Sequence, residues 1–239
     1  MSPALSSSRL FSSAFRWASS SLCGKSLEHY KNDPEGYEAV ARIFLGREEV
    51  ARSVRDIVDI SSSSRRRNLV VDGACGTGIV TDALAGSADC VLGIDLCPEA
   101  LSFARQSKNP SLNFVQGDLH DFSAFAPGSI DVYSMAFAHR YIADLQAFYR
   151  KLAAALSSDG MAVISTAGFA KTLGAIEHHA DVAGLVMKVF RPRFRSLFNR
   201  FHGSCHVVLQ KPFMHRGQVC PLLHRQTSGL SPHTSRDST

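Results

Sequence analysis

The chain has 239 residues, 45% of them hydrophobic and 20% charged, with a formal net charge of +5, which is typical of one globular domain with spare length. No apolar run reaches the roughly 18 residues of a membrane-spanning helix, and none of the six cysteines forms a CxxC pair that would indicate a metal site. The basic residues form no single strong patch, so a solvated surface is favoured and we expect no nucleic-acid partner, while peripheral membrane contact stays open.

The first 27 residues have the composition of a targeting segment. They contain ten serines and the basic residues Arg9, Arg16 and Lys25, and no acidic residue precedes Glu28. Their apolar residues could share one face of a helix. An Arg- and Ser-rich amphipathic start predicts an organellar transit peptide over residues 1–27, mitochondrial ahead of plastid. The alternative is a disordered tail on a cytoplasmic protein.

Helical and strand patterns alternate through the middle of the chain. Residues 36–60 have apolar positions at helical spacing with a break near Gly46, and Pro98 stands where a helix would begin. Short strands that alternate with helices predict an α/β fold, with a mostly parallel sheet covered on both faces. The expected strands are 68–73, 90–96, 112–119, 129–137 and 160–168, and the helices between them are 78–86, 97–108 and 143–158.

The last third is harder to interpret. Residues 204–212 fit an antiparallel C-terminal edge strand ended by Pro212. Residues 171–201 are helical in character and basic, and 184–190 are either a strand or part of that helix. The predicted domain covers 28–212, with an N-terminal helical lid (28–62), a cofactor-binding core (68–168) and a substrate-side segment (169–212), and a disordered tail follows at 213–239.

A glycine-rich turn follows the first expected strand, where such sheets bind ligands. A dinucleotide motif G-x-G-x-x-G read from Gly76 lacks its third glycine. The pattern acid-x-Gly-x-Gly-x-Gly fits residues 72–78 better, with Ala74 in place of its first glycine. Asp95 ends the second strand, where a carboxylate can accept from ribose hydroxyls for either cofactor class. Asp118 ends the third strand, where a carboxylate can accept from an adenine amino group.

These three acids at successive strand ends resemble the class I S-adenosylmethionine-dependent methyltransferase family, in its type 11, small-molecule branch. The resemblance implies a Rossmann-like, doubly wound sheet and S-adenosyl-L-methionine as cofactor. It implies that the loop wraps the methionine part, that Asp95 holds the ribose, and that Ala136 lines the floor under the reactive methyl. The cofactor-binding residues it implies are Asp72, Gly73, Ala74, Gly76, Gly78, Asp95, Leu96, Asp118, Leu119 and Ala136.

Two positions bear on activity. Alanine at position 74 is tolerable if its φ is negative, and we expect cofactor binding to survive; a positive φ would add about 1–3 kcal/mol of strain. His139 follows the fourth strand and is the best candidate for a general base, although a packed histidine is the simpler interpretation. Arg140 and Tyr141 are candidates to shape the pocket, and Tyr30 and Tyr37 are candidates to close over the cofactor.

The favoured function is methyl transfer to a small-molecule acceptor. The segment 134–137 reads Ser-Met-Ala-Phe and lacks the Asn/Asp-Pro-Pro-aromatic motif of enzymes that methylate planar amide or adenine nitrogens. The alternative is a catalytically weak or inactive relative that serves as an assembly or interaction subunit, which Ala74 favours and Asp95 opposes. A nicotinamide-linked enzyme ranks third. The methyl acceptor, the methylated element and the oligomeric state stay open.

Overall fold

The computed structural model describes residues 32–33, 36, 38, 42, 46–61, 67–107, 109, 111–193, 203–212, 214–215 and 218–219. The predicted transit peptide, Tyr30 and Tyr37 lie outside the described residues, as does most of the predicted C-terminal tail. Within that tail, β8 (Met214–His215) and β9 (Gln218–Val219) pair antiparallel. In the part of the chain that is described, no helix has the length and apolarity needed to cross a bilayer.

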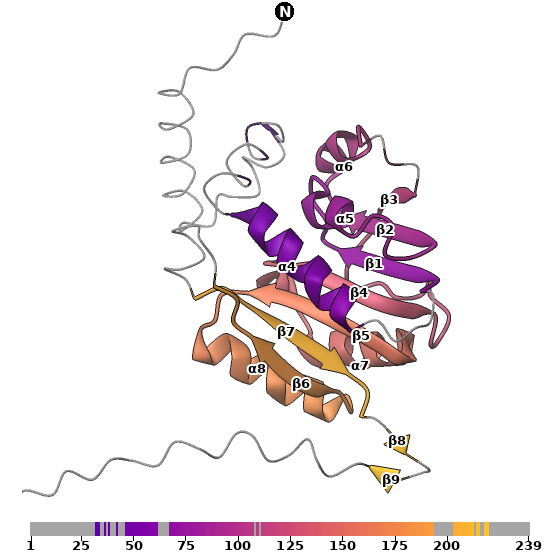
Figure 1. The fold of residues 1–239 in the computed structure, drawn as a ribbon, viewed down its shortest axis with the longest axis vertical. Helices are drawn as coiled ribbons and strands as arrows, with labels where there is room; N and C mark the ends of the chain where they lie inside the picture. Colours follow the sequence, from indigo (N-terminus) through magenta and orange to yellow (C-terminus); the bar gives the residue numbers. More distant parts are fainter. Residues whose placement is uncertain are drawn as a thin grey trace, which may run out of the picture.

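A seven-stranded sheet forms the centre of the molecule, in the order β3-β2-β1-β4-β5-β7-β6 (Figure 1). The first five strands in this order run parallel, and β7 pairs antiparallel with both β5 and β6. The predicted α/β class with a mostly parallel sheet is therefore confirmed. The strands are β1 (Leu69–Gly73), β2 (Cys90–Asp95), β3 (Leu112–Gln116), β4 (Ile130–Ala136), β5 (Leu156–Thr166), β6 (Val186–Phe190) and β7 (Cys205–Gln210).

Helices cover both faces of the sheet because strand residues alternate between two cores. In β5, Met161 and Val163 pack with one cluster, whereas Ala162 and Ile164 pack with the other. The first cluster includes residues of α4 (Arg47–Ile60) and α5 (Ile79–Ala83), and the second includes residues of α7 (Leu145–Ala155) and α8 (Ala170–Val182) (Figure 1). The apolar side chains of each strand thus serve both faces, as a doubly wound sheet requires.

The switch point of the sheet lies at β1, which pairs with β2 on one side and with β4 on the other. The chain leaves β1 toward α5, and β2 is followed by α6 (Pro98–Ala104). Between β3 and β4 the described residues 117–129 contain no helix, and the rings of Phe122 and Phe125 pack against the core there. The carboxyl ends of β1, β2 and β4 consequently meet around one crevice, the usual ligand position in such folds.

The C-terminal hairpin confirms the predicted antiparallel strand but corrects its place in the sheet. Residues 204–212 were expected to form the edge strand, but β7 lies between β5 and β6, and β6 is the edge. The physical reason is burial: Val207 and Leu209 of β7 are fully buried, whereas Val189 and Phe190 of β6 are 39% and 44% exposed. The ambiguous segment 184–190 contains this strand, and β3 ends at Gln116 rather than continuing to residue 119.

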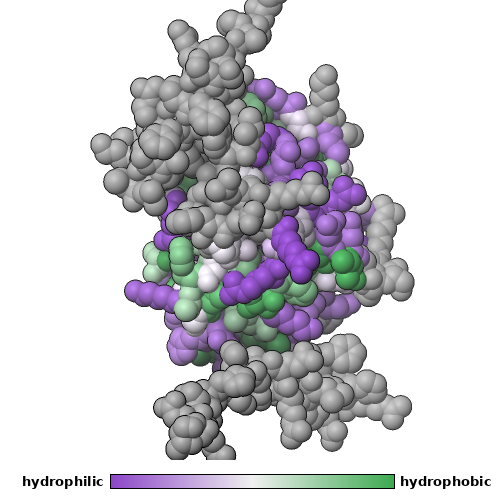
Figure 2. Space-filling view, turned by 60° about the vertical axis from the view of Figure 1, so that its left-hand side comes forward, coloured by the Kyte–Doolittle hydropathy of each residue, from purple (hydrophilic) through white to green (hydrophobic). Residues whose placement is uncertain are grey.

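The exposed side chains of β6 combine apolar and basic character. Lys188, Val189 and Phe190 are exposed, and Arg191 follows them at the surface. Figure 2 turns the left-hand side of Figure 1 forward and shows patches of apolar residues in green between hydrophilic side chains in purple. The exposed edge of the sheet at β6 thus has basic side chains beside apolar ones.

Candidate functional site

The glycine-rich turn after β1 has left-handed backbone at every second residue. The φ angle is 55° at Ala74, 58° at Gly76 and 85° at Gly78. Glycine adopts such angles without cost, whereas an alanine methyl crowds the following carbonyl. Of the two backbone conformations considered for position 74, the structure therefore has the strained one, with a positive φ.

Close packing around the turn explains the remaining glycines. A Cβ at Gly73 would lie 2.1 Å from the Tyr133 hydroxyl oxygen, and a Cβ at Gly78 would lie 3.2 Å from Ala104 and from the ring of Phe114. The backbone N–H of Cys75 donates to the carbonyl of Ile94 over 3.0 Å. The turn is therefore held against β2 and β4, where a side chain at Gly73 would clash with Tyr133 and one at Gly78 would be tightly packed as well as strained.

Asp72 ties the end of β1 to its neighbours. It is 1% exposed and accepts hydrogen bonds from Thr81 Oγ1 at 2.6 Å and from Ser134 Oγ at 2.5 Å. Burial disfavours its charged form and raises its pKa from 3.8 to about 6, despite the two hydroxyl donors. The carboxylate thus holds the start of α5 and the middle of β4 in fixed positions around the turn.

Asp95 connects β2 to the turn. Its Oδ2 accepts from the backbone N–H of Gly76 at 2.7 Å, and its Oδ1 accepts from the backbone N–H of Cys97 at 2.8 Å. Burial raises the pKa of this carboxyl. Because a carboxylate has about four lone-pair sites, each oxygen keeps capacity for a ligand hydroxyl while it holds the loop.

Asp118 lies beyond the end of β3 and contacts a residue that sequence reasoning missed. Its Oδ1 accepts from the backbone N–H of His120 at 2.9 Å and lies 2.6 Å from His120 Nδ1. The backbone N–H of Ala143 donates to His120 Nε2 at 3.1 Å, so the ring proton belongs on Nδ1. The hydrogen bond from the His120 N–H lowers the pKa of Asp118. This pair joins the loop after β3 to the segment before α7.

A cavity of about 320 Å³ opens where these strand ends meet. Of the residues predicted to bind cofactor, Asp72, Ala74, Gly76, Asp95, Leu96, Leu119 and Ala136 line it, whereas Gly73, Gly78 and Asp118 do not. Gly117 and Leu119 form the wall on either side of Asp118. The rest of the lining is Arg47, Cys75, Thr77, Ile79, Val80, Phe137, Ala138, Arg140 and Tyr141.

His139 does not line this cavity, although Ala138 and Arg140 on either side of it do. The His139 side chain is buried, its ring centroid lies 6.1 Å from that of Tyr149, and burial lowers its pKa. These contacts are those of a packed histidine. The geometry therefore does not favour the general-base role considered from sequence.

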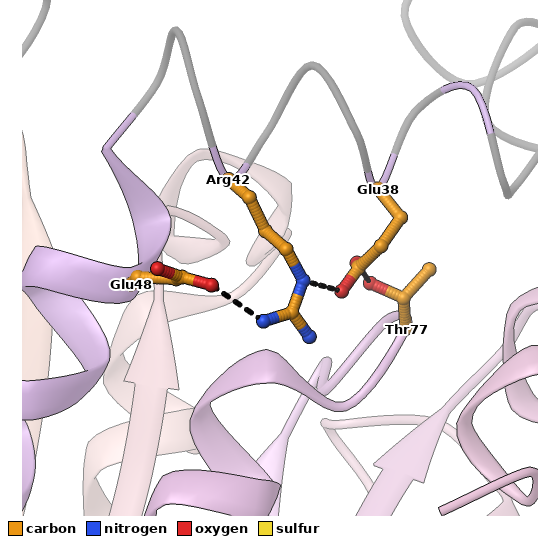
Figure 3. Close-up of polar contacts among 4 residues, drawn as sticks. All are labelled: Glu38, Arg42, Glu48 and Thr77. Atoms are coloured by element: carbon orange, nitrogen blue, oxygen red, sulfur yellow. Dashed lines mark hydrogen bonds and ion pairs between the residues drawn. The ribbon is translucent and has the colours of Figure 1, made fainter. Parts of the chain in front are cut away.

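The N-terminal segment reaches the turn through Glu38, a residue that sequence reasoning also missed. Figure 3 shows that the Glu38 carboxylate accepts from Thr77 Oγ1 of the turn and from Arg42 Nε, the latter at 2.5 Å. The Arg42 guanidinium also donates to Glu48 at 2.7 Å. Glu38 is 5% exposed, so its bond from Thr77 is made largely out of water, whereas the bond between Arg42 and Glu48 is exposed. No local pattern could reveal a contact that spans 39 residues.

A second strained residue lies after β4. Phe137 has a φ of 58°, its N–H donates to the carbonyl of Ser165 at 2.7 Å, and the guanidinium of Arg47 lies 3.8 Å above its ring. A bulky residue in this conformation costs of order 1–3 kcal/mol and persists only where its surroundings impose it. Such strain clusters at functional sites, and here it shapes the wall of the cavity.

Comparisons with known proteins find a methyltransferase domain over part of the chain. The family model described as "Methyltransferase domain" matches residues 71–164. A stretch of 101 residues, 41% of this chain, is 30% identical to the ubiquinone biosynthesis O-methyltransferase of Albidiferax ferrireducens and covers 40% of that protein. A stretch of 112 residues, 47% of this chain, is 30% identical to the biotin biosynthesis bifunctional protein BioHC of Cellvibrio japonicus and covers 22% of it.

Solved structures share the fold at low identity. The TehB-like SAM-dependent methyltransferase from Corynebacterium glutamicum is 22% identical, with a TM-score of 0.56, and the match covers 77% of this chain and 98% of that one. The matches to the two curated relatives span less than half the length of either relative. Residues 71–164, which match the family model, contain every described lining residue of the cavity except Arg47.

Proposed function

We propose that the protein transfers the methyl group of S-adenosyl-L-methionine to a small-molecule acceptor, because residues 71–164 match a methyltransferase-domain model and the fold is similar to that of a SAM-dependent methyltransferase. One observation carries the proposal. The left-handed turn at Ala74, Gly76 and Gly78 is anchored by Asp95, and both the turn and this carboxylate line a single cavity.

Each end of the cavity has groups suited to a part of the cofactor. Asp95 is proposed to accept from the ribose hydroxyls, and Leu96 and Leu119 to enclose the adenine. Asp72 is proposed to face the amino group of the methionine part, and the backbone of the turn to run along it. Asp118 is proposed to act at the adenine edge through the backbone around it, because its side chain is paired with His120.

When bound, S-adenosylmethionine supplies an activated methyl group on a sulfonium, so the protein has to align the acceptor and exclude water. Ala136, Phe137 and Ala138 offer an apolar floor for this purpose. The described lining contains no histidine. The lining thus favours an acceptor that reacts without a dedicated histidine base.

Titration of S-adenosylhomocysteine by calorimetry tests the proposal. We expect 1:1 binding, and we expect Asp95→Asn to weaken it by at least about ten-fold, since each hydrogen bond to a charged group contributes about 1.5–3 kcal/mol. Glu99→Gln is a matched control, because Glu99 is an exposed acid on α6 and does not line the cavity. Absence of binding at millimolar ligand would overturn the cofactor assignment.

The second candidate is a catalytically weak relative that serves as an assembly or interaction subunit. The positive φ of Ala74 favours it, because backbone strain and a methyl group stand where the turn lines the cavity. Isolation of the protein from its native source would distinguish the two. Retained S-adenosylhomocysteine in a monodisperse protein supports the enzyme, whereas a stable complex with other subunits and no affinity for the cofactor supports the alternative.

Mitochondrial location and peripheral membrane contact are two further proposals. The composition of residues 1–27 supports import into mitochondria, and a fluorescent reporter fused to residues 1–30 that stays diffuse in the cytosol would contradict it. Exposed Val189 and Phe190 beside Lys188 and Arg191 support peripheral contact with a membrane. Failure to co-sediment with anionic vesicles would contradict that contact.

A further inference from the structure

The described lining of the cavity carries charges of both signs. Asp72 and Asp95 line it at the ends of β1 and β2, whereas Arg47 and Arg140 line it from the start of α4 and from the 3-10 helix η1 (His139–Tyr141). Two acidic and two basic side chains thus belong to this lining. Both signs matter because each charged side chain selects the part of a ligand with the opposite charge.

The cofactor uses only part of this arrangement. S-adenosylmethionine carries two positive groups, the sulfonium and the ammonium, and one carboxylate. Asp72 is assigned to the ammonium and Asp95 to the ribose hydroxyls, and the single carboxylate of the cofactor needs one arginine. A second arginine in the lining is therefore left for an anion that the cofactor does not provide.

Position decides which arginine that is. Arg47 is half-buried and fixed over the ring of Phe137. Arg140 is exposed, its Nη2 donates to the Tyr141 hydroxyl at 2.9 Å, and its guanidinium lies 4.9 Å from the Tyr141 ring, which is 49% exposed. Arg140 and Tyr141 thus form a basic and aromatic rim where the cavity opens to solvent.

Size places the acceptor at this rim. Ligand sites commonly measure about 300–1,000 Å³, and the 320 Å³ of this cavity is at the small end of that range. A nucleoside-based cofactor fills most of it. The acceptor then lies against Phe137, Ala138 and Tyr141, with Arg140 beside it.

We infer that the methyl acceptor is a small molecule with an apolar or aromatic body and an anionic group, a carboxylate or a phosphate, which Arg140 binds at the mouth of the cavity. This inference rests on the proposed function, because it assigns the cofactor to the rest of the cavity. The Tyr141 hydroxyl, already hydrogen-bonded to Arg140, is a second donor for the same anion.

Binding of matched probes to the protein saturated with S-adenosylhomocysteine tests the inference. Benzoate and phenyl phosphate are the anionic probes, and benzamide is the neutral isostere of benzoate. We expect an anionic probe to bind about ten-fold or more tightly than benzamide, as befits a charged hydrogen bond. The stronger of the two anions identifies the group, carboxylate or phosphate.

Arg140→Gln should reduce the affinity of the anion to that of benzamide and leave the affinity for S-adenosylhomocysteine unchanged. Arg150→Gln, on the exposed surface of α7 and outside the lining, removes the same charge and should leave the preference for anions intact. Equal binding of benzoate and benzamide, no binding of either anion at millimolar concentration, or an anion preference that survives Arg140→Gln would each overturn the inference. Failure to bind S-adenosylhomocysteine at all would instead refute the proposed function.

Discussion

Replacement of Ala74 by glycine tests the strain in the cofactor turn most directly. Ala74 has a φ of 55°, is half-buried and packs against the core beneath α7 and α8. An L-residue in the left-handed region costs roughly 1–2 kcal/mol, which glycine removes. Glycine also makes the unfolded chain more flexible, which costs about 0.5–1 kcal/mol, and a lost methyl group costs up to about 0.8 kcal/mol. The opposing effects nearly cancel, so Ala74→Gly should change the free energy of unfolding by less than about 1 kcal/mol.

A matched control isolates the strain. Ala153 lies within α7, where φ is helical, is also half-buried, and packs against the same core cluster. Ala153→Gly loses the same methyl group and gains the same flexibility with no relief of strain, so it should cost about 1 kcal/mol or more. The difference between the two substitutions is the strain energy, which we expect to be about 1–2 kcal/mol.

Urea unfolding of the wild type and of both variants measures this difference, and calorimetry with S-adenosylhomocysteine on the same samples measures the effect on the ligand. We expect Ala74→Gly to bind the ligand at least as tightly as the wild type, because the removed methyl group lines the cavity. If both glycine variants lose the same stability within about 0.3 kcal/mol, the strain argument is wrong.

Three further outcomes are expected. The pKa of Asp72, about 6 in the fold against 3.8, gives a stabilising contribution that is complete below about pH 3.8 and is lost as the pH rises through 6. Free energies of unfolding from urea titrations at pH 4 to 7 should therefore fall in the wild type by roughly 2–3 kcal/mol relative to Asp72→Asn, and parallel curves would contradict it. Gly73→Ala should destabilise by about 2 kcal/mol or more through its clash with Tyr133, with partial rescue by Tyr133→Phe in a double-mutant cycle; additive effects would refute the contact. Glu38→Ala should speed proteolysis of the N-terminal segment and weaken the binding of S-adenosylhomocysteine. Arg42→Ala leaves the bond from Thr77 in place and should have smaller effects on both; equal effects would exclude a separate role for that bond.

The local order of elements was readable from the sequence because each depends on neighbouring residues. Alternating apolar runs and helical periods predicted the parallel strands β1 to β5 and the helices between them within a few residues. The acid-x-Gly-x-Gly-x-Gly spacing indicated a cofactor turn, since closely spaced glycines have few uses other than left-handed backbone near a ligand. Asp95 was recognisable for the same reason, as the acid that ends the second strand.

Contacts between segments that are distant in the sequence could not be predicted from it. No local feature of residues 204–212 predicts that they pair between β5 and β6, because the order of strands in the sheet depends on long-range contacts. Glu38 and Arg47 contact Thr77 and Phe137 across long stretches of sequence, and no local spacing indicates such contacts.

Fold class, the glycine-rich turn and its acids could be predicted from the amino-acid sequence, because they follow from periodicity and from short motifs of neighbouring residues. Three features depend on packing between distant segments: the sign of φ at Ala74, the burial of His139 away from the cavity, and the presence of Arg140 and Tyr141 in one lining with the two acids. Backbone angles and side-chain directions are set by what packs from the other side. For that reason the cofactor class was predicted from the chain, and the charge of the acceptor was inferred from the structure.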